Sequence, residues 1–224
     1  MPRPPDNLDR ARLYFVCEDR DEPGDLERLL EAALAGGVDL IQLRDKEASD
    51  ERLRRAAPRF RAAADRHDAL FLINDRPDLV AACRADGVHV GQDDVPVAEA
   101  RRQAGPDAVV GLSTHDPEQL RAAHRAAGDA RPDYISVGPV WATPTKPGRP
   151  AAGIDYVRAA AAGAELPWFA IGGIDPANIG EVVAAGARRA VVVRAIRDAA
   201  DPSTIAAELR AALELPISSF AARR

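Results

Sequence analysis

Residues 40–73 read LIQLRDKEASDERLRRAAPRFRAAADRHDALFLI, and this stretch contains the pattern that predicts the fold. A short apolar run at 40–43 is followed by an amphipathic segment at 51–66, and a second apolar run follows at 70–73. Short, nearly continuous apolar runs separated by amphipathic segments are typical of parallel strands whose sheet is covered by helices. The stretch therefore predicts a strand, a helix and a second strand parallel to the first.

The same pattern repeats along the chain. Eight apolar runs predict strands, at residues 13–17, 40–43, 70–73, 87–90, 109–112, 134–137, 168–171 and 190–193. Amphipathic segments predict helices between them, for example at 26–35, 51–66, 118–127, 154–161 and 178–185. Asp116, Asp175 and Asp201 each precede a proline, which is a common way to begin a helix. Eight such units in 224 residues predict an α/β fold, a closed (β/α)8 TIM barrel in a single domain.

The alternative to a barrel is an open, doubly wound sheet. That fold usually has a glycine-rich turn after its first strand. Here residues 18–22 are acidic and contain no glycine, so the barrel is favoured. We expect the barrel to span residues 12–213 and residues 1–11 and 217–224 to be flexible tails.

Composition and charge exclude several classes of partner. The net charge is −5, whereas proteins that bind nucleic acid need a clustered basic surface. No apolar run is long enough to span a membrane, and the first residues lack the apolar region of a signal peptide. The two cysteines, Cys17 and Cys83, match no disulfide framework and no metal spacing. These features predict a cytoplasmic protein and leave the choice between monomer and homo-oligomer open.

Polar residues and glycines follow the predicted strands. In a TIM barrel the active site lies at the carboxyl ends of the strands. The residues at these ends include Arg44, Asp45, Lys46, Asn74, Asp75, Asp93, Asp94, Ser113, His115, Thr143, Thr145, Lys146, Gly172, Gly173 and Arg194. We therefore expect a polar site at this end of the barrel.

Phosphate binding is indicated by two features. Of the 30 basic residues only two, Lys46 and Lys146, are lysines, and both lie in the predicted site. A lysine offers a compact charge on a thin stem, which suits a phosphate oxygen in a narrow pocket. Gly172 and Gly173 precede a predicted helix start, where bare backbone N–H groups favour an anion.

Asp75 and Asp94 are candidate Mg²⁺ ligands. They follow neighbouring predicted strands, so their carboxylates are expected to converge. Two carboxylates together with phosphate oxygens and water are a usual environment for Mg²⁺. Asp93 competes with Asp94 on sequence grounds, and each of these residues also suits a helix cap. Among the histidines, His89 is interpreted as a core residue and His115 as a candidate acid–base group.

The ordered motifs resemble those of thiamine-phosphate synthases over residues 12–213. The matching segments are QLRDK at 42–46, NDR at 74–76, DGVHVGQDDVP at 86–96, GLSTH at 111–115, GPV at 138–140, TPTK at 143–146 and AIGGI at 170–174. The resemblance implies a Mg²⁺-dependent transferase that joins a pyrimidine diphosphate to a thiazole monophosphate and releases pyrophosphate. In this family the diphosphate departs first, and the thiazole nitrogen captures the resulting pyrimidine cation.

The resemblance also implies roles for individual residues. Those holding the pyrimidine diphosphate would be Gln42, Arg44, Lys46, Asn74, Ser113 and Lys146, of which Arg44, Lys46, Ser113 and Lys146 are the catalytic candidates. Asp75 and Asp94 would bind Mg²⁺, which selects Asp94 over Asp93. The thiazole phosphate would meet Thr143, Thr145 and the backbone of Gly173, Val193 and Arg194.

Two residues depart from the family pattern. Asp45, expected at the substrate site, replaces the usual Glu, and Arg194 replaces a frequent Ser. If the family contact at 194 is a backbone N–H it survives, and the arginine side chain is able to add a charge-assisted bond.

Two other functions remain open: a thiazole tautomerase of the same superfamily, and a barrel that binds a phosphate ligand without catalysis. The tautomerase needs no complete diphosphate site.

Overall fold

Eight parallel strands close into a barrel in the order β1 to β8. The computed structural model describes residues 6–143 and 150–215, so the tail expected at 217–224 lies outside it. The strands are β1 (Leu13–Cys17), β2 (Leu40–Leu43), β3 (Leu70–Asn74), β4 (Gly87–Val90), β5 (Val109–Thr114), β6 (Tyr134–Val137), β7 (Trp168–Ile171) and β8 (Ala190–Val192). Their parallel pairing, including β1 with β8, confirms the predicted (β/α)8 barrel.

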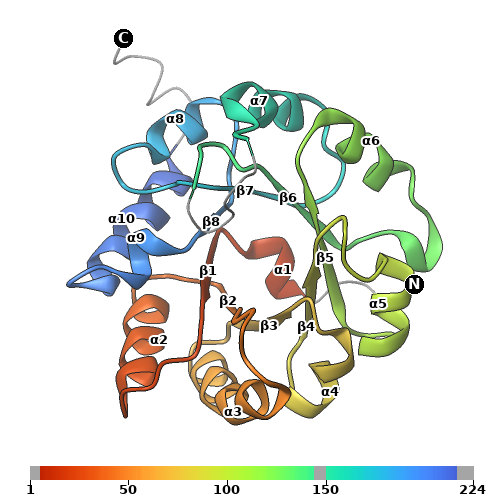
Figure 1. Cartoon of the computed structure of the whole chain (residues 1–224). Coiled ribbons are helices and arrows are strands. Elements are labelled where there is room, and N and C mark those ends of the chain that lie inside the picture. Colours follow the sequence, from red (N-terminus) through yellow and green to blue (C-terminus); the bar gives the residue numbers. More distant parts are fainter. Residues whose placement is uncertain (1–5, 144–149, 216–224) are drawn as a thin grey trace.

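Helices surround the barrel and cover its outer face (Figure 1). The described helices are α1 (Asp6–Arg10), α2 (Asp25–Ala35), α3 (Asp50–Arg66), α4 (Val80–Cys83), α5 (Val97–Ala104), α6 (Pro117–Arg125), α7 (Gly153–Gly163), α8 (Ile179–Ala184), α9 (Arg194–Arg197) and α10 (Pro202–Glu214), with short 3₁₀ turns at Pro77–Leu79 and Gly128–Ala130. The Asp116 carboxylate accepts hydrogen bonds from two backbone N–H groups at the start of α6, and Asp201 does the same for α10. These caps satisfy backbone donors that the first helical turn leaves unpaired.

Two strands continue further than their apolar runs. β3 includes Asn74, which pairs with His89 of β4, and β5 includes Ser113 and Thr114, which pair with residues of β6. Polar side chains are accommodated at these positions because they face the cavity or find hydrogen-bond partners. As a result, Asn74 and Ser113 are held by the sheet and do not depend on a loop for their position.

The inside of the barrel has its own small core. Tyr14, Tyr134 and Phe169 meet there edge to face, with ring centroids 5.5–6.2 Å apart. Smaller aliphatic side chains fill the space around them, including Leu40 and Val191. A second and larger core of leucine, valine and alanine lies between the strands and the helices. The barrel is therefore filled at one end by packed side chains, which leaves the other end for a site.

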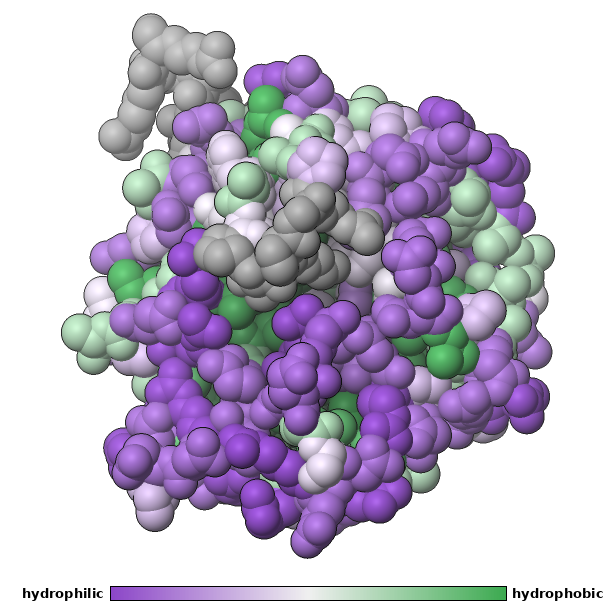
Figure 2. Space-filling view, in the orientation of Figure 1, coloured by the Kyte–Doolittle hydropathy of each residue, from purple (hydrophilic) through white to green (hydrophobic). Residues whose placement is uncertain are grey.

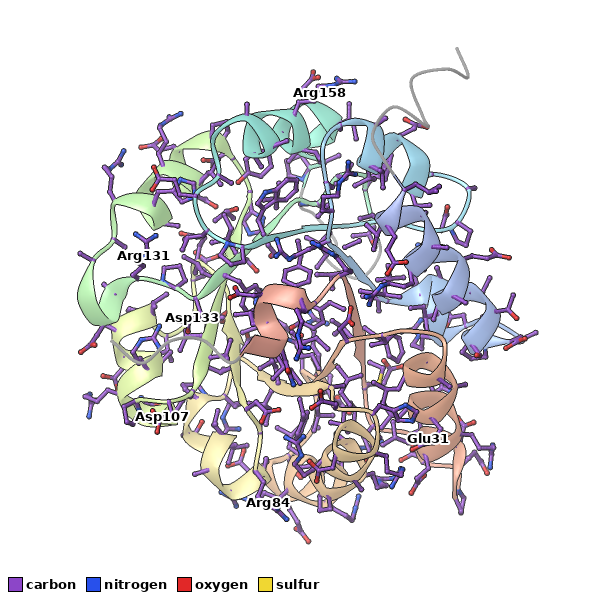
Figure 3. The ribbon with its side chains drawn as sticks, turned by 180° about the vertical axis from the view of Figure 1, so that it is seen from behind. Glu31, Arg84, Asp107, Arg131, Asp133 and Arg158 are labelled. Carbon is purple, nitrogen blue, oxygen red and sulfur yellow. The ribbon has the colours of Figure 1, made fainter. Side chains whose placement is uncertain are left out.

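The amino-terminal segment differs from its prediction. Residues 1–11 were expected to form a tail, but α1 lies across the end of the barrel opposite the strand carboxyl ends (Figure 3). Leu8 and Ala11 are fully buried in the interior core. Arg189 also donates hydrogen bonds of 2.9 and 3.0 Å to backbone carbonyls of this segment. The expectation was wrong for residues 6–11, because one leucine in a polar stretch gave too weak a signal.

The face of the molecule seen in Figure 2 is mainly hydrophilic. Figure 2 shows polar residues around the strand carboxyl ends, with hydrophobic residues deeper toward the centre. Arg84 and Arg158 lie on the outer ring (Figure 3), and Arg158 pairs with Asp155 at 2.6 Å. Within the described ranges, no helix combines the length and the apolar character that crossing a membrane requires.

Truncating the buried leucine of α1 tests whether this helix stabilises the barrel. We expect Leu8→Ala to lower the free energy of unfolding by about 2–3 kcal/mol, because it opens a cavity in the interior core. Urea denaturation monitored by circular dichroism measures the change. The control is Leu215→Ala, since Leu215 is 44% exposed and its loss should cost less than about 0.5 kcal/mol. Equal stability of the two variants would show that α1 is not part of the stable core.

Candidate active site

A cavity of about 320 Å³ opens at the carboxyl ends of the strands. It brings together most of the side chains that the sequence selected. The selected residues that line it are Gln42, Arg44, Lys46, Asn74, Asp75, Asp94, Ser113, Thr143, Gly173, Val193 and Arg194. They come from β2, β3 and β5, from the loops that follow the strands and from the start of α9, so barrel closure is what assembles them.

Three selected residues are not part of this set. Asp45 does not line the cavity: its carboxylate accepts a hydrogen bond from the backbone of Glu47 and lies 3.7 Å from Arg52 Nε. A side-chain role for Asp45 in substrate binding is therefore not supported by its position. The reason is local, since the chain turns after β2 and directs alternate side chains outward. Thr145 and Lys146 lie outside the described residues.

Asp75 and Asp94 meet at one side of the cavity. Burial, together with the charge and hydrogen bond of Asp94, raises the pKa of Asp75 above its usual value. The backbone N–H of Gly91 donates to Asp94 Oδ2 at 2.7 Å, which fixes the second carboxylate. Asp93 and Asp94 are both exposed, but only Asp94 is among the cavity residues. Two carboxylates held against each other suit a cation between them.

The donor set of this pair fits a hard divalent ion. Carboxylate oxygens suit Mg²⁺, which usually takes one or two protein carboxylates and completes its shell with phosphate oxygens and water. Within residues 6–143 and 150–215, no group of three histidine, cysteine or acidic side chains is arranged to hold a metal. A site of this kind would therefore depend on a phosphate ligand for further oxygens.

Asp75 is held in an uncommon backbone conformation. Its φ is 58°, in the left-handed region that non-glycine residues seldom occupy, although aspartate tolerates it better than most. The backbone N–H of Asp75 donates to the carbonyl of His89 at 2.9 Å and so extends the pairing between β3 and β4. The conformation turns the chain sharply after β3, at the point where the carboxylate reaches the cavity.

Cationic side chains face the carboxylates. Lys46 Nζ lies 3.5 Å from Asp75 Oδ2. Arg44 and Arg194 also line the cavity, and neither forms an ion pair with another described residue. By contrast, the nearby Arg59 binds the buried Asp19 at 2.5 Å. Arg44 and Arg194 are thus available to an anionic ligand.

The glycine turn after β7 is closely packed. Gly172 and Gly173 have φ values of 107° and 69°, which favour glycine. A Cβ at Gly172 would lie 2.5 Å from the Cβ of Pro139, so a larger residue would displace the loop after β6. Asn178 Nδ2 donates to the Gly173 carbonyl at 2.8 Å and fixes the turn. The close packing brings bare backbone to the cavity wall, where it is able to approach a phosphate.

The floor of the cavity contains polar contacts that the sequence did not reveal. Gln42 Nε2 donates to Tyr14 Oη at 2.5 Å, and His89 Nε2 lies 2.9 Å from Ser113 Oγ. His89 is only 8% exposed, in agreement with its interpretation as a core residue, but it also lines the cavity. The available signal was its position in a strand next to the strand of Ser113, which places both inside the barrel.

His115 lies at the rim of the cavity. Its Nδ1 is 2.6 Å from the carbonyl oxygen of Gly138, and since a carbonyl only accepts, this nitrogen carries a proton. The hydrogen bond ties the end of β5 to the loop after β6. His115 therefore has a structural role at this loop, which does not depend on the acid–base function considered for it.

The chemistry available to this cavity is electrostatic. It offers cations, paired carboxylates, a hydroxyl and bare backbone N–H groups. Cys17 and Cys83 are both buried, and burial raises the pKa of each thiol. Such thiols are poor nucleophiles. The arrangement thus suits the binding of a polyanion and the stabilisation of negative charge on a departing group.

Comparisons with known proteins agree on one family. A family model described as thiamine monophosphate synthase matches residues 13–196. The thiamine-phosphate synthase of Acidothermus cellulolyticus is 52% identical over 208 residues, covering 92% of this chain and 97% of that protein. The thiamine-phosphate synthase of Thermobifida fusca is 54% identical over 206 residues, with coverage of 91% and 92%.

Solved structures agree with the sequence relatives. A thiamine phosphate pyrophosphorylase from Pyrococcus furiosus superposes with a TM-score of 0.80 at 29% identity, covering 92% of this chain and 97% of the other. A thiamine phosphate pyrophosphorylase from Bacteroides thetaiotaomicron has a TM-score of 0.62 at 18% identity, with coverage of 92% and 100%. The second likeness concerns the fold alone.

Replacing Asp75 tests the carboxylate pair. Because the pKa of Asp75 is raised in the folded state, the unfolded chain ionises first as the pH rises above 3.8, and the resulting loss of stability is complete above the folded-state pKa. We expect Asp75→Asn, without metal, to raise the midpoint of thermal unfolding at pH 7 by a few degrees. The gain should vanish as the pH falls toward the usual aspartate pKa of 3.8, where the wild-type carboxyl is protonated. Differential scanning calorimetry across this pH range measures it.

The same variant should lose its response to Mg²⁺. In the wild type, Mg²⁺ with inorganic pyrophosphate should raise the unfolding midpoint, because a ligand that binds only the folded state stabilises it. Asp75→Asn and Asp94→Asn should show little or no increase. Asp93→Asn is the matched control and should respond like the wild type. A normal response in Asp94→Asn together with a lost response in Asp93→Asn would reverse the choice between the two.

Proposed function

Because the chain belongs to the thiamine monophosphate synthase family, we propose that its cavity joins the two halves of thiamine phosphate. The substrates would be 4-amino-2-methyl-5-(diphosphooxymethyl)pyrimidine and a thiazole monophosphate, and the products thiamine phosphate and pyrophosphate. The enzyme is a transferase, like its curated relatives. The observation that carries the proposal is that carboxylates, free cations and a glycine turn line one cavity.

The pyrimidine diphosphate would bind across β2, β3 and β5. Arg44 and Lys46 reach the cavity beside the Asp75 carboxylate, and Ser113 offers a hydroxyl at its floor. The proposed order begins with cleavage of the bond between the methylene carbon and the diphosphate oxygen. The electron pair leaves with the diphosphate, so negative charge grows on oxygens that the cations face. Arg44, Lys46 and Ser113 stabilise this charge, and Lys146 is proposed to join them.

Asp75 and Asp94 are proposed to hold Mg²⁺. When bound, Mg²⁺ supplies positive charge beside the diphosphate oxygens. The two carboxylates fit this role because they converge and because the pKa of Asp75 is raised by burial and by its partner. Lys46, 3.5 Å from Asp75, balances part of the remaining negative charge.

The thiazole phosphate would bind at the opposite wall. Its proposed contacts are the backbone of Gly173 and of residues 193–194, with the hydroxyls of Thr143 and Thr145. The Arg194 side chain lines the cavity without an ion pair to the described residues and is proposed to add a charge-assisted bond to this phosphate. The thiazole nitrogen then donates its electron pair to the pyrimidine methylene carbon and forms the new C–N bond.

The location of the reaction is also a proposal. Both cysteines are free and buried, as expected of a protein in a reducing compartment. Together with the biosynthetic nature of the reaction, this supports action in the cytoplasm. The presence of Arg44, Lys46 and both carboxylates in one cavity favours the synthase over the tautomerase, which handles no diphosphate.

A direct assay tests the reaction. Purified protein mixed with both substrates and Mg²⁺ should form thiamine phosphate and pyrophosphate in equal amounts, measured by chromatography and by a pyrophosphate assay. Excess EDTA should abolish the product, and added Mg²⁺ should restore it. Absence of product with Mg²⁺ and both substrates would overturn the proposed reaction. Isomerisation of a thiazole phosphate carboxylate in its place would favour the tautomerase.

The two lysines can be tested by size as well as by charge. Lys146→Ala should lower kcat by about 100-fold or more, which is the scale expected when a preorganised charge at a leaving group is lost. Lys46→Arg and Lys146→Arg keep the charge but replace a compact ammonium by a planar fork, so both should remain well below wild-type activity. Steady-state kinetics measure the loss. Full activity in both arginine variants would show that only charge matters.

A further inference from the structure

A chain of hydrogen bonds crosses the inside of the barrel beneath the cavity. It starts at Gln42 on β2 and passes through Tyr14 on β1, Tyr134 on β6 and His89 on β4 to Ser113 on β5. The successive distances are 2.5 Å, 3.3 Å, 2.9 Å and 2.9 Å. None of the five side chains is more than 8% exposed. The chain thus links two ligand-facing side chains through the interior of the protein.

The two tyrosines of this hydrogen-bond chain differ from its other three residues because they do not line the cavity. Gln42, His89 and Ser113 line the cavity, whereas Tyr14 and Tyr134 are not among its lining residues. The tyrosine rings belong to the aromatic core and pack edge to face at a centroid distance of 6.2 Å. They are able to act on a ligand only through the groups that they hold.

Space for the Tyr134 ring is provided by a glycine on the neighbouring strand. A Cβ at Gly111 would lie 2.1 Å from Tyr134 Cζ and 2.4 Å from its hydroxyl oxygen. Gly111 lies opposite Tyr134 in the pairing of β5 with β6. The missing side chain is therefore what allows the phenol to reach the centre of the barrel.

The direction of the hydrogen bonds follows from counting hydrogens. Burial raises the pKa of both phenols far above neutrality, so each keeps one hydrogen to donate. Gln42 donates to Tyr14, which leaves the Tyr14 hydrogen for Tyr134. Tyr134 then donates to His89 Nδ1, and His89 carries its own proton on Nε2 and donates it to Ser113. The result is one continuous direction.

With the Gln42 amide nitrogen facing Tyr14, the opposite direction leaves a buried hydrogen without a partner. If His89 were protonated on Nδ1 it would donate to Tyr134, and Tyr134 would donate to Tyr14. Tyr14 would then accept from both Gln42 and Tyr134, and among the described residues no further acceptor is in reach of its own hydrogen. A buried, unsatisfied donor is unfavourable. The first direction is therefore the more stable one.

Ser113 is a hydrogen-bond donor toward the cavity in the favoured direction. Its oxygen accepts from His89 and, at 3.5 Å, from Ser136. A hydroxyl with both lone pairs occupied has its hydrogen left for a ligand. At the other end, Gln42 uses its amide nitrogen for Tyr14, so its amide oxygen remains for the ligand. The hydrogen-bond chain therefore presents an acceptor to the ligand at Gln42 and a donor at Ser113.

We propose that Tyr14 and Tyr134 are positioning residues that fix this direction, so that Gln42 presents an acceptor and Ser113 a donor to the substrate. The identity of the ligand groups rests on the proposed function. An amino group on the pyrimidine ring is a donor and suits the oxygen of Gln42. A diphosphate oxygen is an acceptor and suits the hydroxyl of Ser113. The chain therefore sets the polarity of both ends together.

The tautomer of His89 tests the direction without any turnover. Nitrogen-15 NMR of protein labelled at histidine distinguishes a protonated ring nitrogen from a bare one, and a spectrum of His89→Asn assigns the signal. In the free wild-type enzyme we expect the proton on Nε2 and a bare Nδ1. Tyr134→Phe should lose this single tautomer, because Nδ1 loses its donor. A wild-type proton on Nδ1, or an unchanged tautomer in Tyr134→Phe, would overturn the proposal.

Kinetics provide the second test. Tyr134→Phe should lower kcat about tenfold, the factor that corresponds to one lost hydrogen bond at the upper end of the usual range. Tyr14→Phe should mainly raise the KM for the pyrimidine diphosphate, because it releases Gln42. Tyr156→Phe is the matched control: its hydroxyl is also buried and donates to Thr114 at 2.7 Å, outside the chain. It should change kcat and KM less than twofold.

The outcomes separate this proposal from the proposed function. If Tyr134→Phe and Tyr14→Phe behaved like Tyr156→Phe in both kcat and KM, the tyrosines would not be positioning residues. If the wild type formed no thiamine phosphate, the reaction would be wrong, but the imidazole spectrum would still decide the direction of the chain. Circular dichroism spectra and unfolding midpoints of the variants show that each of them is folded.

Discussion

Closure of the parallel sheet is the constraint on which the site depends. Once β8 pairs with β1, every strand ends at the same rim, and residues far apart in the chain become neighbours. Lys46 and Asp75 meet in this way, although they follow different strands. The interior core under the rim, closed from the other end by α1, keeps the strands in register. The site is therefore as rigid as the sheet that carries it, except where loops contribute.

This arrangement has an unfavourable energetic consequence at the two carboxylates. Asp75 is buried beside Asp94, and burial together with the charge of Asp94 makes the Asp75 carboxyl harder to ionise and raises its pKa. Asp75 also occupies a left-handed backbone conformation that most residues avoid. Both features are unfavourable in the protein when no cation is bound, and they become useful when a cation binds between the carboxylates. Local instability of this kind is common where binding requires groups that repel each other.

Much of the architecture was predictable because it depends on local patterns. The eight strands were located to within two residues, since apolar runs and helix caps are properties of short segments. Most selected site residues line one cavity because strand ends must meet in a closed barrel. The sequence alone did not distinguish Asp93 from Asp94, since adjacent residues differ only in the direction of their side chains. It missed the outward turn of Asp45 for the same reason, and it missed the burial of Leu8 because a single leucine in a polar stretch is a weak signal. The Tyr14–Tyr134 contact joins residues 120 positions apart, and neither residue differs in type from an ordinary core tyrosine.

The glycine opposite Tyr134 has a consequence for how this barrel can change over time. Since a Cβ at position 111 and a phenol at position 134 compete for one space, the acceptable residue at each position depends on the other. Substitutions at the two positions are therefore expected to be strongly non-additive. A lineage that enlarged residue 111 would first have to give up the ring at 134. Glycine at position 111 and the aromatic ring at position 134 are therefore expected to be retained together.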